Sequence, residues 1–215
     1  METIEMMPVR VRIASILKKA IYAGEYKSGD ELSLTDLAAK LGVSRTPVRE
    51  AFLSLEAEGL ITLRMNRGAI VNTIDKKFIR DRFEMRILLE GEAASLAALN
   101  QMDTKDLQRR IEMLEKEGWD HLPEKESSYV SLNAELHLVI WTAAGNEKLK
   151  SYLLELWNGP SHQSDEASTL SHYQASTREH LELLDAIERG DAPLAKEIMR
   201  GHIKRSMENI LAVYS

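Results

Sequence analysis

Three histidines and one asparagine are the residues of this 215-residue chain whose types and spacing could hold a metal ion. Asn133 and His137 are four residues apart, so on a helix their side chains share one face. His180 and His202 lie at equal distances from residue 191, where Gly190-Asp191 predicts a break between two helices. If those helices fold back as a hairpin, the two histidines come level with each other. Three imidazoles that meet inside a helical bundle suit a borderline divalent ion such as Zn²⁺ or Ni²⁺.

Spacing alone leaves a second interpretation open, in which the three histidines are separate and each is satisfied in the core or half exposed. The helix around His137 is apolar on most sides, which indicates a central position in a bundle. Polar groups there need partners, because burying one unpaired costs on the order of 1–3 kcal/mol. Two further histidines, His162 and His172, are expected at the surface. Glu135 and Glu179 adjoin histidines in the sequence and are expected to point to other helix faces.

Arg86 and Glu90 form a pair at i, i+4 on a long predicted helix. One interpretation is an ion pair on the helix surface. The other is that the guanidinium of Arg86, near a cation, binds a small carboxylate, because its planar fork matches the two oxygens of that group. The pair alone does not choose between these two interpretations.

A second group of residues predicts contact with DNA. Ser33 and Asp36 are typical of the start of a short helix, and Gly42 permits the sharp turn that would follow that helix. Ser44 can then cap a second helix, in which Pro47 is tolerated because first-turn amides have no acceptor within the helix. The spacing therefore predicts a helix-turn-helix.

The second helix of this motif has one apolar face and one polar face. Val48, Phe52 and Leu55 recur at i, i+4, i+7 and predict the buried stripe. The first turn carries hydroxyls and arginines away from that stripe, as a helix that reads a major groove requires. These candidate DNA-binding residues are Ser44, Arg45, Thr46 and Arg49. An ordinary helical hairpin with surface arginines is the less favoured interpretation.

A small β-hairpin is predicted directly after the helix-turn-helix. The β-prone runs 60–63 and 69–71 are joined by a turn that contains Arg67 and Gly68. At the tip of such a wing, these two residues could enter a minor groove or approach a phosphate. An incidental arginine in a solvated turn explains Arg67 nearly as well.

Composition divides the chain into two parts. The net charge is −6, but residues 1–72 carry 10 Lys and Arg against 9 Asp and Glu, whereas the remainder carries 18 against 25. All six histidines lie in the acidic remainder, which shows helical patterning throughout and no predicted strand. We therefore expect a mainly α fold with two domains, a winged helix-turn-helix at 1–74 and an antiparallel helical bundle of about six helices at 75–215.

The absence of cysteine excludes disulfides and thiolate sites. The N-terminus lacks the pattern of a signal peptide, and no apolar run approaches the roughly 18 residues of a membrane span. A cytoplasmic protein without a membrane partner is the expectation.

The run Gly-Val-Ser-Arg-Thr-Pro-Val-Arg-Glu-Ala at 42–51, followed by Glu58-Gly59-Leu60, resembles the winged helix-turn-helix of the GntR family of bacterial transcription regulators. The preceding 28–32 and Leu37-Ala38 fit the same pattern. The resemblance implies that Ser44, Arg45, Thr46 and Arg49 contact DNA. Some members carry an arginine early in the first helix of the motif, where this chain has Thr35.

The second half resembles the all-helical FCD effector domain of the FadR-type branch, in its VanR-like form with a shorter helical domain. Many members hold a metal with an Asp-x-x-x-His pair and two later histidines. The resemblance implies His137, His180 and His202 as ligands, with Asn133 at the position of the usual aspartate. Two outcomes of this replacement are open: a three-histidine site of weaker affinity with Asn133 as a marginal ligand, or a cavity that holds no metal. It also implies that Arg86 faces the effector pocket.

These observations predict a transcription regulator whose operator binding is controlled by a small-molecule effector, expected to be a carboxylate. A homodimer would place two recognition helices in successive major grooves of a near-palindromic double-stranded operator. The alternative is a metal-dependent enzyme that uses a three-histidine site and carries an appended DNA-binding module. An enzyme of that type needs a nearby general base, and none is expected here.

Overall fold

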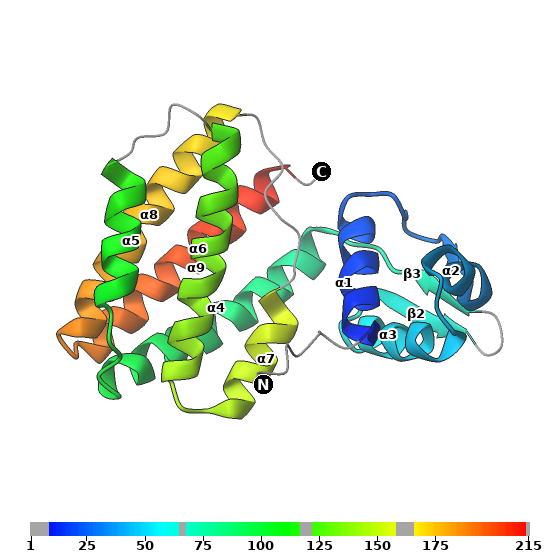
Figure 1. Ribbon diagram of the computed structural model, residues 1–215, viewed down its shortest axis with the longest axis horizontal. Helices are drawn as coiled ribbons and strands as arrows, with labels where there is room; N and C mark the ends of the chain where they lie inside the picture. Colours follow the sequence, from blue (N-terminus) through cyan, green and yellow to red (C-terminus); the bar gives the residue numbers. More distant parts are fainter. Residues whose placement is uncertain (1–8, 65–67, 117–121, 158–165, 214–215) are drawn as a thin grey trace, which may run out of the picture. The chain divides into compact units, whose positions relative to one another are not determined.

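The computed structural model describes residues 9–64, 68–116, 122–157 and 166–213 (Figure 1). Their contacts group them into two compact units, one that ends at Phe78 and one that begins at Ile79. Each unit has its own set of buried apolar side chains. The expected mainly α fold class is confirmed, with a winged helix-turn-helix followed by a helical domain.

The first unit packs three helices against a small sheet. Its elements are α1 (Val9–Tyr22), β1 (Glu31–Leu32), α2 (Leu34–Leu41), α3 (Arg45–Ala57), β2 (Ile61–Arg64) and β3 (Gly68–Val71). The sheet is antiparallel in the order β1-β3-β2, so the predicted hairpin of β2 and β3 is present and β1 adds an edge strand. Val48, Phe52 and Leu55 of α3 are fully buried, as their spacing predicts.

Local sequence explains the turn between α2 and α3. The hydroxyl of Ser33 accepts a hydrogen bond from the amide of Asp36, 3.3 Å away, at the start of α2. Gly42 ends α2 in the left-handed conformation with φ of 65°, which glycine adopts without a steric penalty. Ser44 occupies the N-cap position of α3 without a side-chain hydrogen bond to the helix. The hydroxyl of Ser44 is therefore not used in capping α3.

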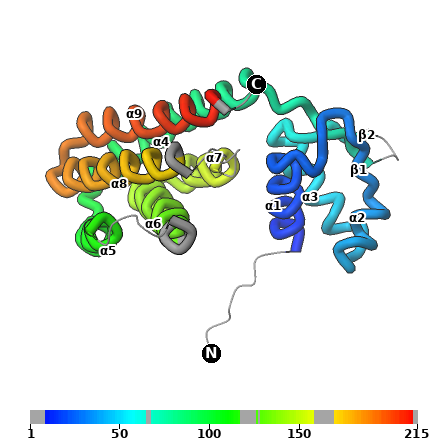
Figure 2. Tube along the Cα trace, turned by 90° about the horizontal axis from the view of Figure 1, so that it is seen from above, coloured from blue at the N-terminus to red at the C-terminus, as the bar shows by residue number. Residues whose placement is uncertain are grey.

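Helices make up the second unit throughout its described residues. They are α4 (Lys76–Leu99), α5 (Lys105–Lys116), α6 (Leu122–Ala143), α7 (Glu147–Trp157), α8 (Glu166–Glu188) and α9 (Ala192–Val213). Helices α8 and α9 lie antiparallel and side by side (Figures 1 and 2). Gly190 turns the chain between them with φ of 70°, so the predicted hairpin is confirmed.

Helices α4, α6, α8 and α9 contribute most of the interior of the second unit, and Ile111 of α5 and Leu153 of α7 are buried there too. Small residues on α4 let neighbouring helices approach closely, and leucine and isoleucine on the other helices fill the remaining space. The fully buried residues include Ala93, Ala94, Ala97, Leu136, Ile140, Leu184, Ile187, Ala195 and Met199. The histidines of interest project from these same helices, so a packed core fixes their positions.

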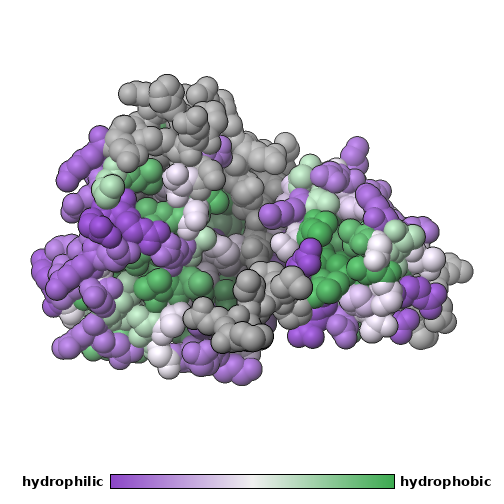
Figure 3. Space-filling model, viewed as in Figure 1, coloured by the Kyte–Doolittle hydropathy of each residue, from purple (hydrophilic) through white to green (hydrophobic). Residues whose placement is uncertain are grey.

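Apolar side chains also reach the surface of both units (Figure 3). Those with at least half of their surface exposed include Ile16, Leu53, Leu88, Leu99, Met113, Val130 and Tyr152. Among the described residues, no helix combines the length and the apolar character needed to cross a membrane.

Candidate functional site

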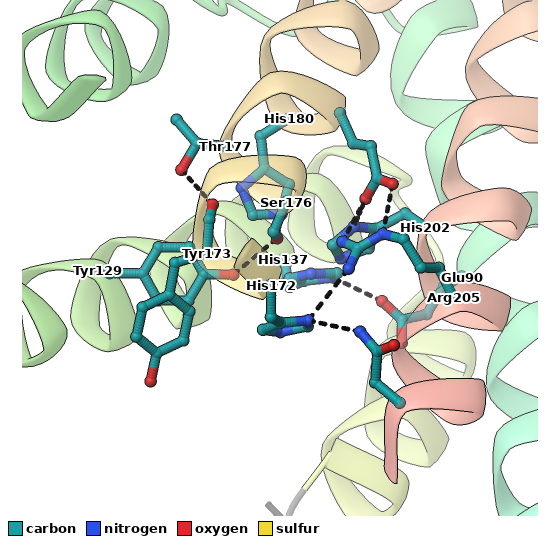
Figure 4. A network of polar contacts seen from close by, with 12 residues as sticks. Glu90, Tyr129, His137, His172, Tyr173, Ser176, Thr177, His180, His202 and Arg205 are labelled. Carbon is teal, nitrogen blue, oxygen red and sulfur yellow. Dashed lines mark hydrogen bonds and ion pairs between the residues drawn. The ribbon is translucent and has the colours of Figure 1, made fainter. Parts of the chain in front are cut away.

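His137, His180 and His202 meet inside the second unit (Figure 4). They come from α6, α8 and α9, and one ring nitrogen of each lies within 4.8 Å of the others. The ring centroids of His180 and His202 are 4.7 Å apart, and that of His137 lies 5.8 and 5.4 Å from them. All three side chains are almost completely buried. The structure thus brings together the three histidines that the sequence placed on separate helices.

A buried carboxylate holds the first of these histidines. Nδ1 of His137 lies 2.6 Å from Oε2 of Glu90, a residue of α4 with no exposed surface. Arg86 donates from Nε to Oε1 of the same carboxylate at 2.7 Å. Burial raises the pKa of Glu90, but the charge of Arg86 and the contacts with His137 outweigh burial and lower this pKa to about 2. Glu90 is therefore ionised at neutral pH and accepts a hydrogen bond from Nδ1–H of His137.

The second histidine has a matching arrangement nearer the surface. Nδ1 of His202 lies 2.7 Å from Oε2 of Glu179 on α8, and Nη2 of Arg205 donates to this oxygen at 2.6 Å. Nε of Arg205 donates to the other oxygen of Glu179. Burial raises the pKa of Glu179, and hydrogen bonds from His202 and Arg205 lower it to about 2. A quarter of the Glu179 side chain is exposed, whereas Glu90 is sealed in the core.

The third histidine has hydroxyl neighbours instead of a carboxylate. Nε2 of His180 lies 3.4 Å from Oγ of Ser176, to which the hydroxyl of Tyr129 donates at 2.6 Å. Burial lowers the pKa of His180 well below its ordinary value, and the other two histidines add to the effect. Burial also lowers the pKa of His202, against the opposing influence of Glu179. His180 and His202 are consequently neutral at pH 7, the form in which imidazole binds metals.

The two glutamates that contact the histidines differ from what the sequence predicted. Glu179 does not point away from the cluster as predicted. Adjacent residues on α8 are only 100° apart, and the longer side chain reaches His202 while His180 faces the other rings. Glu90 was predicted only as the partner of Arg86, and its contact with His137 was missed. The sequence signal was the helical spacing of Arg86 and Glu90, which does not reveal the helix packed against them.

Arg86 is already engaged by other groups in this structure. Besides its bonds to Glu90, its guanidinium lies 4.9 Å from the ring centroids of both Phe83 and Trp157. Such aromatic contacts stabilise a cation in a desolvated position. The geometry makes Arg86 a partner of Glu90 rather than a fork that is open to a ligand.

The remaining predicted positions around the cluster are less involved. Asn133 lies half-buried on α6, one turn before His137. His172 is half-buried, contrary to the expected surface position, and its Nδ1 lies 3.0 Å from Nη1 of Arg205. Packing of α8 against α9 covers it. His162 lies outside the described residues.

The donor set fits a metal ion. Three imidazoles at mutual ligand distance suit a divalent metal ion, and carboxylates on the outer nitrogens of two of them are typical of histidines that bind metal. Two arginine charges offset the two glutamate charges. A divalent ion would therefore keep its charge uncompensated and would favour an anionic ligand.

The predicted DNA-reading residues form an exposed group at the start of α3. Ser44, Arg45, Thr46 and Arg49 are all exposed, while Val48 between them is buried. Only side chains on that outer face are free to enter a groove of DNA. The helix thus presents two cations and two hydroxyls on a rigid element.

Arg67 and Gly68, the two residues predicted at the tip of the wing, have different outcomes. Arg67 lies outside the described residues. Gly68 belongs to β3, is buried, and pairs with Arg64 of β2. A Cβ at Gly68 would lie 2.0 Å from the carbonyl oxygen of Leu32 in β1. This close approach of two strands explains the glycine without any contact to DNA.

Two family models match the chain. The model for bacterial regulatory proteins of the gntR family matches residues 10–71, and the model for the FCD domain matches residues 81–205. Among curated proteins, the HTH-type transcriptional regulator YdhC of Bacillus subtilis (strain 168) is 27% identical over 208 residues. That alignment covers 94% of this chain and 91% of YdhC.

Solved structures share the fold. E. coli McbR/YncC superposes with a TM-score of 0.70 at 22% identity and covers 98% of this chain and 100% of that chain. The metal-free FCD domain of TM0439 superposes with a TM-score of 0.51 at 25% identity, covering 66% of this chain and 96% of that domain.

Proposed function

Because this chain belongs to the GntR family of transcription regulators and carries a C-terminal FCD domain, we propose that a small-molecule effector in the second unit controls its binding to an operator. The enzyme alternative is set aside, since the family is one of regulators. The observation that carries the proposal is the buried cluster of His137, His180 and His202 in the same chain as an exposed recognition helix. We further propose that the domains are residues 1–74 and 75–215.

DNA recognition is assigned to the outer face of α3. Arg45 and Arg49 would supply the charge and the bidentate donors that read guanine edges, and Ser44 and Thr46 would bind neighbouring phosphates or bases. We retain Arg67 as a wing contact, since it follows the exposed Arg64 by only three residues. Two copies of the chain would read the two halves of a near-palindromic operator.

Substitution of the two arginines tests this assignment. Arg45→Ala and Arg49→Ala should each weaken operator binding by about 1–3 kcal/mol and relax the base preference at one position in each half-site. The measurement is footprinting on the DNA upstream of the protein's own gene, with unchanged circular dichroism as the folding check. Arg109→Ala, an exposed arginine of the second unit, is the matched control. Near-normal footprints from both α3 variants would overturn the assignment.

The sensor is assigned to the histidine cluster. His137, His180 and His202 would hold Zn²⁺ or Ni²⁺, and Asn133 would stand near the ion as a weak neutral ligand. A bound ion would supply a positive centre to which a carboxylate effector attaches. Support comes from the donor set, which contains three imidazoles and no carboxylate and so leaves the charge of the ion to be balanced by its ligand. The effector class is therefore a small organic acid.

Metal analysis of the purified full-length chain tests the sensor. We expect close to one Zn²⁺ or Ni²⁺ per chain, removable by a chelator and restored by the metal alone. Loss of the metal should lower the melting temperature, because an ion that binds only the folded chain stabilises it. Absence of metal from the wild-type protein, both as purified and after incubation with Zn²⁺ or Ni²⁺, would contradict the metal assignment and leave the DNA assignment intact.

A further inference from the structure

Two of the three clustered histidines are held by the same sequence of groups, an arginine, a glutamate and then Nδ1 of the imidazole. Arg86 and Glu90 of α4 form one such chain with His137. The second chain runs from Arg205 of α9 through Glu179 of α8 to His202. These two sets of hydrogen-bonded groups come from different helices, yet each ends on a ring of the cluster.

Each set of arginine, glutamate and histidine determines which nitrogen of its imidazole carries the proton. An ionised carboxylate only accepts hydrogen bonds, so the nitrogen beside it must donate. Nδ1 of His137 and of His202 therefore carries the proton, and Nε2 keeps the lone pair that a metal needs. Arg86 donates to Glu90, and Arg205 donates to both oxygens of Glu179, so each carboxylate is bonded to a cation as well as to its histidine. Both rings are thus in the metal-binding tautomer before any ion arrives.

The ligand set itself carries no negative charge, because Asn133 is a neutral amide. Glu90 and Glu179 are the carboxylates that contact the ligand histidines. A carboxylate on the outer nitrogen makes an imidazole more basic and a better donor to a cation. We propose that Glu90 and Glu179, each held by its arginine, are positioning residues that give this cluster of imidazoles its affinity for metal. This inference rests on the metal site proposed above.

The geometry also reassigns Arg86. The arginine that was expected to receive the effector has Nε and Nη2 on Glu90 and aromatic rings against its guanidinium. Its role is to orient Glu90 against His137. An effector carboxylate would then meet the ion and not Arg86.

The first test measures metal affinity in variants that keep the shape of each carboxylate. Glu179→Gln is the lead variant, since Glu179 is partly exposed and its loss leaves no sealed charge behind. Glu90→Gln is the buried counterpart. Each should weaken Zn²⁺ binding by about 10- to 100-fold in competition with a chromogenic chelator. Co²⁺ absorption should show an altered ligand field in both variants.

Glu135→Gln is the matched control. Glu135 lies two residues before His137 on α6 and forms its own two-point ion pair with Arg110 at 2.6 and 2.7 Å. Its carboxylate is therefore held by α5 and not by a histidine of the cluster. Its Zn²⁺ affinity should equal that of the wild type. If Glu90→Gln fails to fold, the Zn²⁺ affinity of Glu179→Gln alone tests the inference.

The second test reads the tautomers without metal. Long-range ¹⁵N–¹H spectra of the metal-free full-length chain should show Nδ1–H on His137 and His202. In Glu179→Gln, His202 should lose this preference while His137 keeps it, which a general loss of stability would not produce. Wild-type rings protonated at Nε2, or Zn²⁺ affinities within twofold of wild type in both variants, would overturn the inference. A wild-type chain that binds no metal would instead refute the proposed sensor.

Discussion

At the scale of single residues, the charge of the candidate metal centre depends on Asn133. This residue lies one turn before His137 on α6 and is half-buried, at the edge of a cluster whose three histidines are nearly sealed from water. Its amide oxygen is a weaker donor to a transition metal than a carboxylate oxygen, and it brings no charge. The proposed site therefore offers its ion three imidazoles and at most a weak amide oxygen, with an ionic ligand left to come from outside.

Asn133→Asp should tighten metal binding. A carboxylate at this position would add a unit charge within a few ångströms of the ion, which at an effective dielectric constant of about 20 amounts to several kcal/mol before the cost of desolvation. We expect a gain on the order of tenfold or more in Zn²⁺ affinity, measured by chelator competition on the full-length chain. Asn133→Ala is the control and should change the affinity little. Equal affinities in the wild type and Asn133→Asp would place residue 133 outside the site.

The sequence predicted the histidines of this site better than their partners. His180 and His202 could be found because a single glycine-marked turn fixes their register, and helical hairpins keep residues at equal distance level. Glu90 could not be assigned to His137 in the same way, because 47 residues separate them and only the packing of α4 against α6 joins them. Arg86 shows the same limit, since Trp157 contacts it from α7.

At the scale of elements, the three-stranded sheet depends on the close approach of Gly68 in β3 to the backbone of Leu32 in β1. β1 has two residues, too few for a periodic pattern, so the sequence predicted β2 and β3 but not the strand beside them. Gly68 has φ of 90° and lies so near the backbone of Leu32 that any side chain would collide with it. Glycine at this position thus makes the pairing of β1 with β3 sterically allowed.

Gly68→Ala should destabilise the first unit. A non-glycine residue at this φ costs on the order of 1–3 kcal/mol, and the collision with Leu32 adds to that cost. We expect faster amide hydrogen exchange in β1 and β3 and weaker operator binding at unchanged metal content. Gly24→Ala is a matched control, because Gly24 has φ of 75° and a Cβ there would have no atom within 4 Å. Its loss of stability should reflect backbone strain alone. Equal effects of the two substitutions would show that the collision is relieved by movement of β1.

At the scale of the whole molecule, one continuous helix joins the two compact units. α4 begins at Lys76, soon after β3, and carries Arg86 and Glu90 into the core of the second unit. A change at the proposed metal site that moved Glu90 would act on the same helix that follows the wing. Control of DNA binding requires two conformations of the chain, one that binds DNA and one that does not. An effector shifts the balance between them only by the difference in its affinity for the two.

A carboxylate effector should change operator affinity only when the histidine cluster is intact. Coupling between two sites in regulators is typically about 1–3 kcal/mol, which corresponds to roughly 5- to 150-fold in affinity. We expect one member of a panel of small organic acids to shift operator binding of the metal-loaded chain by such a factor. The measurement is fluorescence anisotropy of labelled operator DNA at fixed salt.

His180→Leu is the variant that best isolates this coupling. His180 contacts Ser176 and no carboxylate in the described structure, so its removal leaves neither Glu90 nor Glu179 without its histidine. The variant should bind operator DNA as the wild type does, yet should not respond to the acid. Linkage adds a stricter requirement, because operator DNA must change the affinity for the acid by the same factor that the acid changes the affinity for DNA. A response that survives in His180→Leu, or two factors that differ, would place the effector elsewhere than on the histidine-bound ion.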